Sequence, residues 1–244
     1  MFSSFAKRMT EKQWRKTSGK PRRSLAVKIM PDFIIIVVFA LVGYLLGSVN
    51  AAVIVSKIIY KKDIREFGSG NAGTTNMLRT FGRKAAALTL IIDFMKGIVA
   101  CLIPCIIIYW ALSDHHLGLN SMMAAACGAV CGHNWPVYFG FKGGKGVLIS
   151  FSVMLFLAPL PALIALAVFV VVTAVSRYVS LGSVFAALAY PFAVFFIGGW
   201  PDNTKGLTVF LIVSVLLCLL LIVRHHANIV RLFKGQESKL SFRK

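Results

Sequence analysis

Acidic residues are scarce in this chain. Only 8 of its 244 residues are Asp or Glu, against 27 Lys and Arg, so the formal net charge is +19. In a soluble protein that charge would favour a nucleic-acid partner. The chain is, however, 58% hydrophobic with a mean hydropathy of +0.79, well above the roughly 45–50% apolar content of soluble domains. We therefore expect a membrane protein whose basic residues face anionic headgroups and a phosphorylated substrate, with no nucleic-acid partner.

Two further absences narrow the function. The cysteines all fall in apolar stretches and lack zinc-type spacing with histidine, so we expect small core residues and no metal site. The Gly144-Lys145 pair is followed by Gly146, where a Walker A loop carries Ser or Thr, so we expect no ATPase activity. The cysteines are Cys101, Cys105, Cys127, Cys131 and Cys218.

The alternating pattern of a membrane β-barrel strand is also missing. Stretches such as 160–174 and 207–223 are continuously apolar, and a helix needs about 20 such residues to cross the bilayer. We therefore predict an all-α, polytopic membrane protein with about seven transmembrane helices. The short fourth segment and the fifth could instead form one unit kinked at Pro159 and Pro161. The predicted segments are 32–57, 85–111, 121–139, 147–158, 160–176, 183–199 and 207–223.

The distribution of Lys and Arg predicts the orientation. The segment 57–84 and the tail after residue 223 are rich in both, whereas 113–120 and 158–161 contain neither and 199–206 contains only Lys205. Basic loops stay in the cytoplasm. We expect a multi-pass protein of the cell inner membrane, with a cytoplasmic C-terminus and its polar motifs on the cytoplasmic face.

The first 30 residues do not fit this scheme. They hold nine basic residues and one acidic residue, yet seven spans would place them outside. Either Met30 is the natural start, or residues 1–30 form a disordered basic extension on the cytoplasmic surface and the chain has one span fewer. N-terminal sequencing of the native protein distinguishes the two. In neither case is the segment a signal peptide, and we expect residues 31–244 to form a single transmembrane domain.

A first polar loop, Gly68-Ser-Gly-Asn-Ala-Gly-Thr-Thr-Asn76, lies between two predicted spans. Glycines allow close approach to an anion, hydroxyl groups donate hydrogen bonds to it, and a following arginine offers a bidentate fork. Alternatively, the loop is a flexible glycine turn, and Asn76 serves only as the cap of the helix that follows. The candidate phosphate-binding residues here are Ser69, Gly70, Asn71, Thr75, Asn76 and Arg79.

A second polar loop, from Gly132 to Val147, ends where the next span begins. Glycine N–H groups at a helix N-terminus bind phosphate with the help of the helix dipole, and nearby lysines add full charge. Alternatively, the lysines anchor the chain at the interface, and His133 only hydrogen-bonds the loop backbone. The candidates are Lys142, Gly143, Gly144, Lys145 and Gly146.

Two further clusters complete the set. Ser180 and Ser183 lie three residues apart and can face one side of a helix start, although N-capping explains them equally well. His225 and Asn228 share a helical face where the last span ends, and a histidine there can move a proton near neutral pH. The alternative for this cluster is a polar helix end that complements the dipole. Inside the second span, Asp93 and Lys96 should form an ion pair.

These four clusters, in this order, resemble the bacterial acyl-phosphate-dependent glycerol-3-phosphate acyltransferase family over about residues 32–240. The resemblance implies a seven-helix fold and transfer of a fatty acyl group from acyl phosphate to the 1-hydroxyl of glycerol 3-phosphate, giving lysophosphatidic acid and inorganic phosphate. It also implies no metal and no acyl-CoA or acyl-carrier-protein donor. The sequence departs from the family at Asn50, where proline is expected, and in the basic extension before Met30.

The resemblance also assigns roles by position. It implies a functional set of Ser69, Arg79, Lys145, Ser180, His225 and Asn228, with Lys142 and Ser183 as neighbours. No histidine is followed by an aspartate five residues later, so His225 or a phosphate oxygen is the expected proton acceptor. No cofactor is expected. The expected partners are glycerol 3-phosphate, fatty acyl phosphate and membrane lipid, with the enzyme that forms acyl phosphate as a candidate protein partner. The rival functions are a small anion or phosphate transporter and a scaffold protein.

Overall fold

The computed structural model describes residues 30–197 and 204–240, and these residues form helices and loops with no strand. Predictions about the basic extension 1–29, most of the loop 199–206 and the last four residues lie outside this part of the chain. The first half contains α4 (Asp32–Ser48), α5 (Ala51–Tyr60), the 3-10 turn η1 (Ile64–Glu66), α6 (Thr74–Phe81), α7 (Arg83–Pro104), the π-helical η2 (Cys105–Ala111) and α8 (His115–Asn134). The second half contains η3 (Val137–Phe139), α9 (Val147–Leu157), α10 (Pro159–Ser176), α11 (Val179–Ile197), α12 (Thr204–Arg224) and α13 (His226–Phe233).

The all-helical membrane architecture predicted from the sequence is confirmed. Five helical stretches are long and apolar enough to cross a bilayer, and α9 is a shorter apolar helix. Each predicted segment overlaps one of these stretches, α8 or α9. The long stretches are Asp32–Tyr60, Arg83–Ala111, Pro159–Ser176, Val179–Ile197 and Gly206–Arg224.

The predicted bounds of the third segment were wrong. The third segment begins at His115 instead of residue 121, because the carboxylate of Asp114 accepts a hydrogen bond from Leu117 N at 3.1 Å and caps the helix. It ends at Asn134 instead of residue 139. The fourth and fifth segments are separate helices, as predicted, and the alternative of one kinked unit is excluded, because Ala158 leaves the helical conformation and Pro159 starts a new helix.

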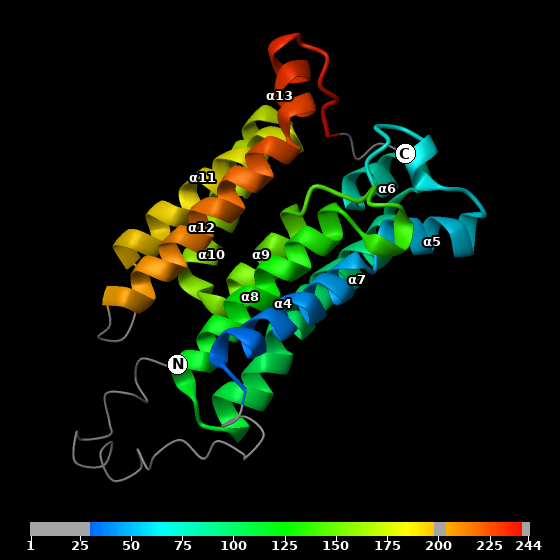
Figure 1. Cartoon of the computed structure of the whole chain (residues 1–244). Helices are drawn as coiled ribbons and strands as arrows, with labels where there is room; N and C mark the ends of the chain where they lie inside the picture. The colour runs from blue at the N-terminus through cyan, green and yellow to red at the C-terminus, as the bar shows by residue number, and fades with distance from the viewer. Residues whose placement is uncertain (1–29, 198–203, 241–244) are drawn as a thin grey trace.

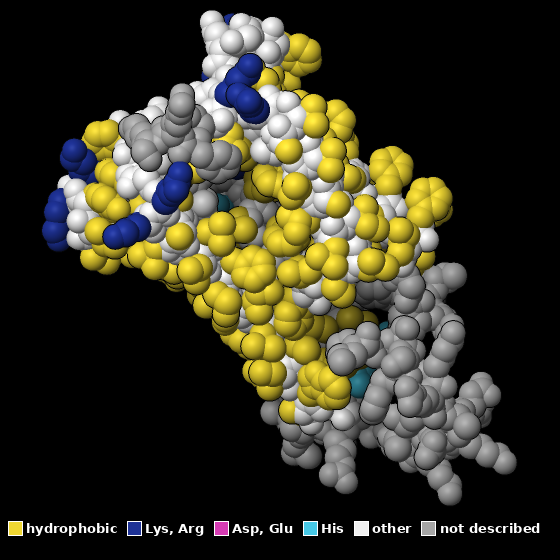
Figure 2. All heavy atoms as spheres, turned by 180° about the vertical axis from the view of Figure 1, so that it is seen from behind, with side chains coloured by type: hydrophobic (Ala, Val, Ile, Leu, Met, Phe, Trp, Pro, Cys, Tyr) yellow, Lys and Arg dark blue, Asp and Glu magenta, His cyan; other side chains and the backbone are white. Residues whose placement is uncertain are grey.

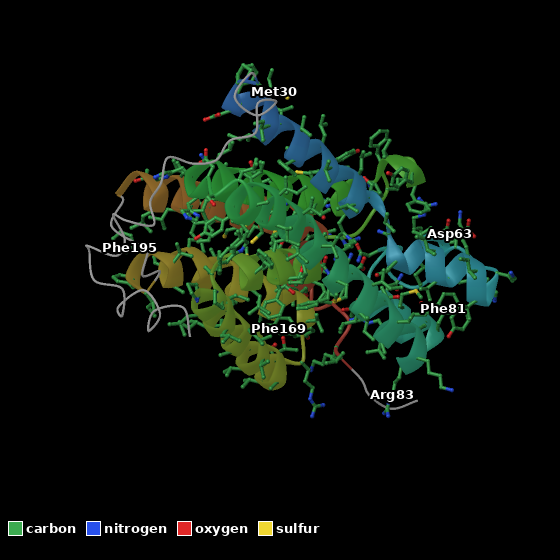
Figure 3. All side chains as sticks on the ribbon, turned by 90° about the horizontal axis from the view of Figure 1, so that it is seen from below. Met30, Asp63, Phe81, Arg83, Phe169 and Phe195 are labelled. Atoms are coloured by element: carbon green, nitrogen blue, oxygen red, sulfur yellow. The ribbon has the colours of Figure 1, made fainter. Side chains whose placement is uncertain are left out.

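The helices form two groups (Figure 1). One contains α4, α5, α7, α8 and α9, and the other contains α10, α11 and α12. In Figure 3, Asp63, which follows α5, and Phe81, the last residue of α6 just before α7, lie on the side opposite Phe195 at the end of α11. A continuous cluster of buried side chains from α7 to α12 joins the groups, including Ala126, Ile149 and Tyr190.

Within the first group, α4 and α8 pack closely through glycines. A side chain at Gly43 or Gly47 would overlap with the backbone of Ala125 or Ala129, and Gly128 and Gly132 face α4 in the same way. Small residues allow this approach between membrane helices. Gly43 and Gly47 therefore serve the packing of α4 on α8.

Basic side chains gather at one end of the molecule. Figure 2 shows Lys and Arg at the end that carries α5, α6 and α13, and a hydrophobic surface below them. The two predicted polar loops and the start of α13 lie at the same end (Figure 1).

Candidate active site

A cavity of about 490 Å³ lies between the two helix groups at the basic end. Its walls come from α6, α7, α8, α9, α10, α11, α12, α13 and the tail that follows α13. One part of the wall is polar and includes Arg79, Lys145 and Asn228; the other is apolar and includes Ala165, Phe169 and other residues. The polar part contains ten of the predicted site residues: Ser69, Asn71, Thr75, Asn76, Arg79, Lys145, Gly146, Ser180, Ser183 and Asn228.

Asn76 holds the first polar loop in shape. It lies inside α6, so the alternative that it serves only as a helix cap is wrong. Its Nδ2 donates to the carbonyl oxygens of Phe67 and Asn71 at 2.9 and 3.0 Å, and its Oδ1 accepts from Ser69 N at 3.0 Å. With both ends of the buried amide engaged, Asn76 fixes the loop around the candidate anion site.

The second polar loop delivers Lys145 and Gly146 to the cavity. Gly146 lies directly before Val147, the first residue of α9, so the predicted helix start is confirmed. Its φ of +81° is in the left-handed region, which glycine adopts without strain. Lys145 donates a hydrogen bond to Oδ1 of Asn228 on α13. Burial lowers the pKa of Lys145 to about 8, although the nearby carboxylate of Glu237 opposes this effect.

The loop between α10 and α11 brings the two serines to the same wall. Ser180 is the second residue of α11, past the cap position, and its hydroxyl donates to Glu237 Oε1 at 3.0 Å. The Ser183 hydroxyl donates to the Val179 carbonyl at 2.8 Å, within its own helix. The alternative that these serines act as N-caps is therefore wrong.

Glu237, which the sequence analysis missed, is the centre of this polar network. Its Oε1 accepts from Asn228 Nδ2 at 2.7 Å and from Ser180, and its Oε2 accepts from Arg231 Nε at 2.8 Å. The side chain is 5% exposed. Burial would raise its pKa, but these three donors together hold the pKa below its usual value, so the group is a carboxylate at neutral pH.

The tail that carries Glu237 crosses the cavity mouth. Arg79 donates to the Ser238 carbonyl at 2.9 Å, and Leu240 N donates to the Arg177 carbonyl at 2.7 Å. Figure 1 shows this segment running from α13 towards α6. The tail therefore links the two helix groups at their polar end.

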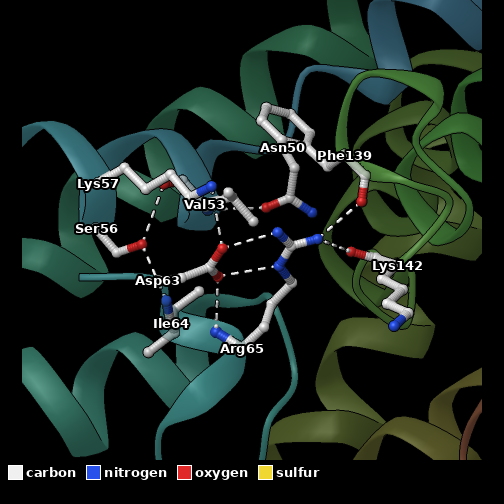
Figure 4. A network of polar contacts seen from close by, with 9 residues as sticks. All are labelled: Asn50, Val53, Ser56, Lys57, Asp63, Ile64, Arg65, Phe139 and Lys142. Atoms are coloured by element: carbon white, nitrogen blue, oxygen red, sulfur yellow. Dashed lines mark hydrogen bonds and ion pairs between the residues drawn. The ribbon is translucent and has the colours of Figure 1, made fainter. Parts of the chain in front are cut away.

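Three of the predicted residues lie elsewhere. Gly70, Lys142 and Gly143 line a second cavity of about 330 Å³, together with Arg65, Phe141 and Arg224. Arg65 joins the two loops there, because Asp63 holds its guanidinium while its Nη1 donates to the carbonyl oxygens of Phe139 and Lys142 (Figure 4). This ion pair holds the pKa of Asp63 well below its usual range.

Gly144 and His225 line neither cavity. Gly144 N donates to the His133 carbonyl at 3.0 Å, and its own carbonyl accepts from Arg224 at 2.7 Å. His225 is 3% exposed at the turn between α12 and α13, and its Nδ1 donates to the Leu221 carbonyl at 2.8 Å. Burial lowers its pKa to about 4, so the ring is neutral at pH 7 with Nε2 unprotonated.

A charged cluster lies deeper in the first helix group. Asp93 and Lys96 form the predicted ion pair at 2.7 Å. The ring of His133 contacts Lys96 Nζ through Nδ1 at 2.9 Å, so the alternative that His133 only hydrogen-bonds the loop backbone is wrong. Among the described residues no three His, Cys, Asp or Glu side chains come together in a way that could hold a metal ion.

Comparison with known proteins decides the family. The family model for glycerol-3-phosphate acyltransferase matches residues 37–235. This chain belongs to the glycerol-3-phosphate acyltransferase family. The glycerol-3-phosphate acyltransferase of Thermoanaerobacter pseudethanolicus is 42% identical over 206 residues, covering 84% of this chain and 95% of that protein. The relative from Listeria monocytogenes EGD-e is 39% identical over 208 residues, covering 85% of this chain and 98% of its own length.

The solved structures agree with the family. The crystal structure of PlsY (YgiH), an integral membrane glycerol 3-phosphate acyltransferase, in its glycerol 3-phosphate form has a TM-score of 0.73 and 32% sequence identity, over 84% of this chain and 96% of that one. Its lysophosphatidic acid form has a TM-score of 0.69. The chain is thus an integral membrane protein of this acyltransferase family.

Proposed function

We propose that this protein transfers a fatty acyl group from acyl phosphate to the 1-hydroxyl of glycerol 3-phosphate, giving lysophosphatidic acid and inorganic phosphate. The observation that carries the proposal is a single cavity with a cationic, hydroxyl-rich part and an apolar part. That combination suits two phosphorylated substrates, one of which bears a long hydrocarbon chain. Membership of the family supports the acyl acceptor, and the relatives solved in glycerol 3-phosphate and lysophosphatidic acid forms support the acceptor and product.

The polar part would hold both phosphates. Arg79 and Lys145 approach from different loops, so each phosphate can meet its own cation, while Ser69, Thr75 and the Gly146 N–H add donors. Asn228 holds Lys145, and Ser180 lies beside it on the same wall. Fixed donors of this kind reduce the repulsion between two anions and stabilise the charge that develops on the leaving phosphate.

The reaction then needs only one proton transfer. The 1-hydroxyl oxygen attacks the acyl carbonyl carbon, the bond from that carbon to the phosphate oxygen breaks, and phosphate leaves. With a pKa of about 4, His225 is a weak base, and its imidazole lines neither cavity. We therefore assign the proton to a phosphate oxygen of the donor, and we assign His225 to holding the turn that presents Asn228.

The hydrocarbon chain would occupy the apolar part of the cavity, whose walls α9, α10, α11 and α12 supply. The residues there are small or flexible, including Met154, Ala162, Ala165, Leu217 and Leu221. Their position in a membrane protein gives the chain an apolar path beside the lipid. We also propose that the polar end faces the cytoplasm of the inner membrane, because the basic side chains gather there.

The test uses the purified full-length protein in detergent with palmitoyl phosphate and glycerol 3-phosphate. We expect release of inorganic phosphate and formation of lysophosphatidic acid, both dependent on glycerol 3-phosphate. Lys145→Met should abolish most of the turnover, whereas Lys84→Met, at an exposed lysine of α7, should leave it unchanged. A folded protein that yields no product, or that instead carries phosphate across liposomes, would favour the transporter.

A further inference from the structure

Lys96 carries a positive charge that the reaction does not use. It lies on α7 inside the helix bundle, and the side chains of Lys96 and its partner Asp93 are 7% and 2% exposed. Burying an ion pair costs free energy that its own attraction only partly offsets. A buried pair in a membrane helix therefore calls for a role that an apolar pair could not fill.

The Lys96 ammonium contacts three polar groups, one through an ion pair and two through hydrogen bonds. One is the Asp93 carboxylate at 2.7 Å, and one is the Val49 carbonyl at 2.7 Å. The third is Nδ1 of His133 at 2.9 Å. An ammonium can only donate, so Nδ1 accepts and the proton of the neutral ring is on Nε2.

The Val49 contact leads to the first polar loop. Val49 and Asn50 form the break between α4 and α5, where helix carbonyls lose their own partners. Lys96 satisfies the Val49 carbonyl, and the next residue, Asn50, caps α5 and donates from Nδ2 to the Ala72 carbonyl at 3.5 Å. Ala72 belongs to the loop that precedes Arg79.

The His133 contact leads to the second polar loop. The Nε2 edge of His133 lies against Gly144, where a Cβ atom would overlap with it, and the His133 carbonyl accepts from Gly144 N. Gly144 directly precedes Lys145. Asp93 and His133 also belong to the wall of the main cavity, so this cluster lies directly beneath the site.

We propose that Lys96 is a positioning residue that fixes, through Val49 and His133, the relative place of the two loops that carry Arg79 and Lys145. This inference rests on the proposed function. One buried ammonium connects three separate elements, α7, the α4–α5 break and α8, and both loops depend on these elements. Without it, Lys145 would retain its chemistry but lose its place relative to the substrate phosphates.

The test is a double-mutant cycle between two residues that do not touch. Lys96→Met should lower kcat/KM for glycerol 3-phosphate by about tenfold to a hundredfold, the cost of misplacing a group by about 1 Å. In a Lys145→Arg background the further loss from Lys96→Met should be several-fold smaller, because the contact of residue 145 with the substrate phosphate, which Lys96 positions, is already altered. Thr89→Val is the matched control, since Thr89 is buried on α7 and bonds only to its own helix at Ala85.

Equal losses in both backgrounds would overturn the proposal, and so would a loss from Thr89→Val as large as that from Lys96→Met. If Lys96→Met does not fold, His133→Leu replaces it in the double-mutant cycle with Lys145→Arg, because His133→Leu leaves the Asp93–Lys96 pair intact. The unaltered protein is assayed alongside. If the unaltered protein turns over but the effects of the two substitutions simply add, only the positioning role of Lys96 is rejected. If the unaltered protein shows no turnover, the proposed function is rejected as well.

Discussion

At the scale of single residues, a carboxylate lies inside a site that we propose binds anions. Glu237 accepts hydrogen bonds from Asn228, Ser180 and Arg231. Because a carboxylate can only accept, it turns Nδ2 of Asn228 towards itself and leaves Oδ1 for Lys145. Its negative charge also favours the protonated form of Lys145. Glu237 thus influences the geometry and the charge of the lysine without contacting it.

This arrangement predicts a pH effect for Glu237→Gln. Phosphate binding needs the ammonium form of Lys145, so affinity falls as pH rises through its pKa of about 8. Removing the Glu237 charge lowers that pKa further. We therefore expect the alkaline limb of the profile of KM for glycerol 3-phosphate to move to lower pH by roughly half a unit to one unit.

The matched control for this shift is Glu66→Gln, which removes the same charge at an exposed position of η1. It should leave the profile in place. An unchanged alkaline limb in Glu237→Gln would show that the carboxylate does not support the charge on Lys145. A lower KM at all pH values would instead mark Glu237 as a competitor of the substrate.

His225 provides a second prediction at this scale. Its Nδ1–H donates to the Leu221 carbonyl, and Nδ2 of an asparagine can take the same place. We therefore expect His225→Asn to retain most of kcat, whereas His225→Ala, which loses the donor, should lose about tenfold or more. Steady-state rates between pH 6 and 9 measure this. A similar loss in both variants, with disappearance of an acidic limb, would restore the histidine as the base.

The residues that sequence reasoning missed show where it stops. Glu237 had one signal, since it is the only acidic residue after position 223 in a strongly basic tail. Its partners, Ser180 on α11 and Asn228 on α13, lie 57 and 9 residues away in the chain. Composition cannot show such contacts. The pair Asp93–Lys96 was predictable because both residues lie on one helix, whereas the third member, His133, belongs to another.

At the scale of elements, the packing of α4 on α8 depends on backbone contact. A valine at Gly43 would overlap with the Ala125 carbonyl, so the helices would have to separate. We expect Gly43→Val to destabilise the protein by about 1–3 kcal/mol or more, seen as a lower midpoint of thermal unfolding in detergent. Leu41→Val, on the exposed side of α4, is the control. Equal midpoints for both variants would contradict this.

Most elements could be predicted because a bilayer demands long apolar helices, and their ends follow from caps and prolines. The errors came from local chemistry that hydropathy does not register. Asp114 caps α8, so this helix starts at His115 and not at the predicted residue 121. The short helix α6 carries polar residues and was predicted only as a motif-bearing loop, whereas α5 lies largely inside the first predicted span, 32–57. The four motifs were found because their residue types are unusual beside apolar spans, but their division between two cavities depends on how loops fold together.

At the scale of the whole molecule, the apolar part of the cavity should limit acyl-chain length. Ala165 on α10 is buried in this wall. We expect Ala165→Phe to lower kcat/KM for palmitoyl phosphate by about tenfold or more, with a smaller loss for a 10-carbon acyl phosphate, because the larger ring fills space that the longer chain needs. Leu163→Phe, on the exposed face of the same helix, is the control. An equal loss for both chain lengths would place the hydrocarbon elsewhere.

The course of the tail affects how the protein should be handled. Trimming the chain after Phe233, a common way to shorten a membrane protein for crystallisation, would remove Glu237, Ser238 and Leu240 together. Arg79 and Arg231 would then lose partners, and the two halves of the bundle would lose their link at the mouth. An inactive truncated sample would therefore reveal little about catalysis. Affinity tags are better placed at the opposite terminus.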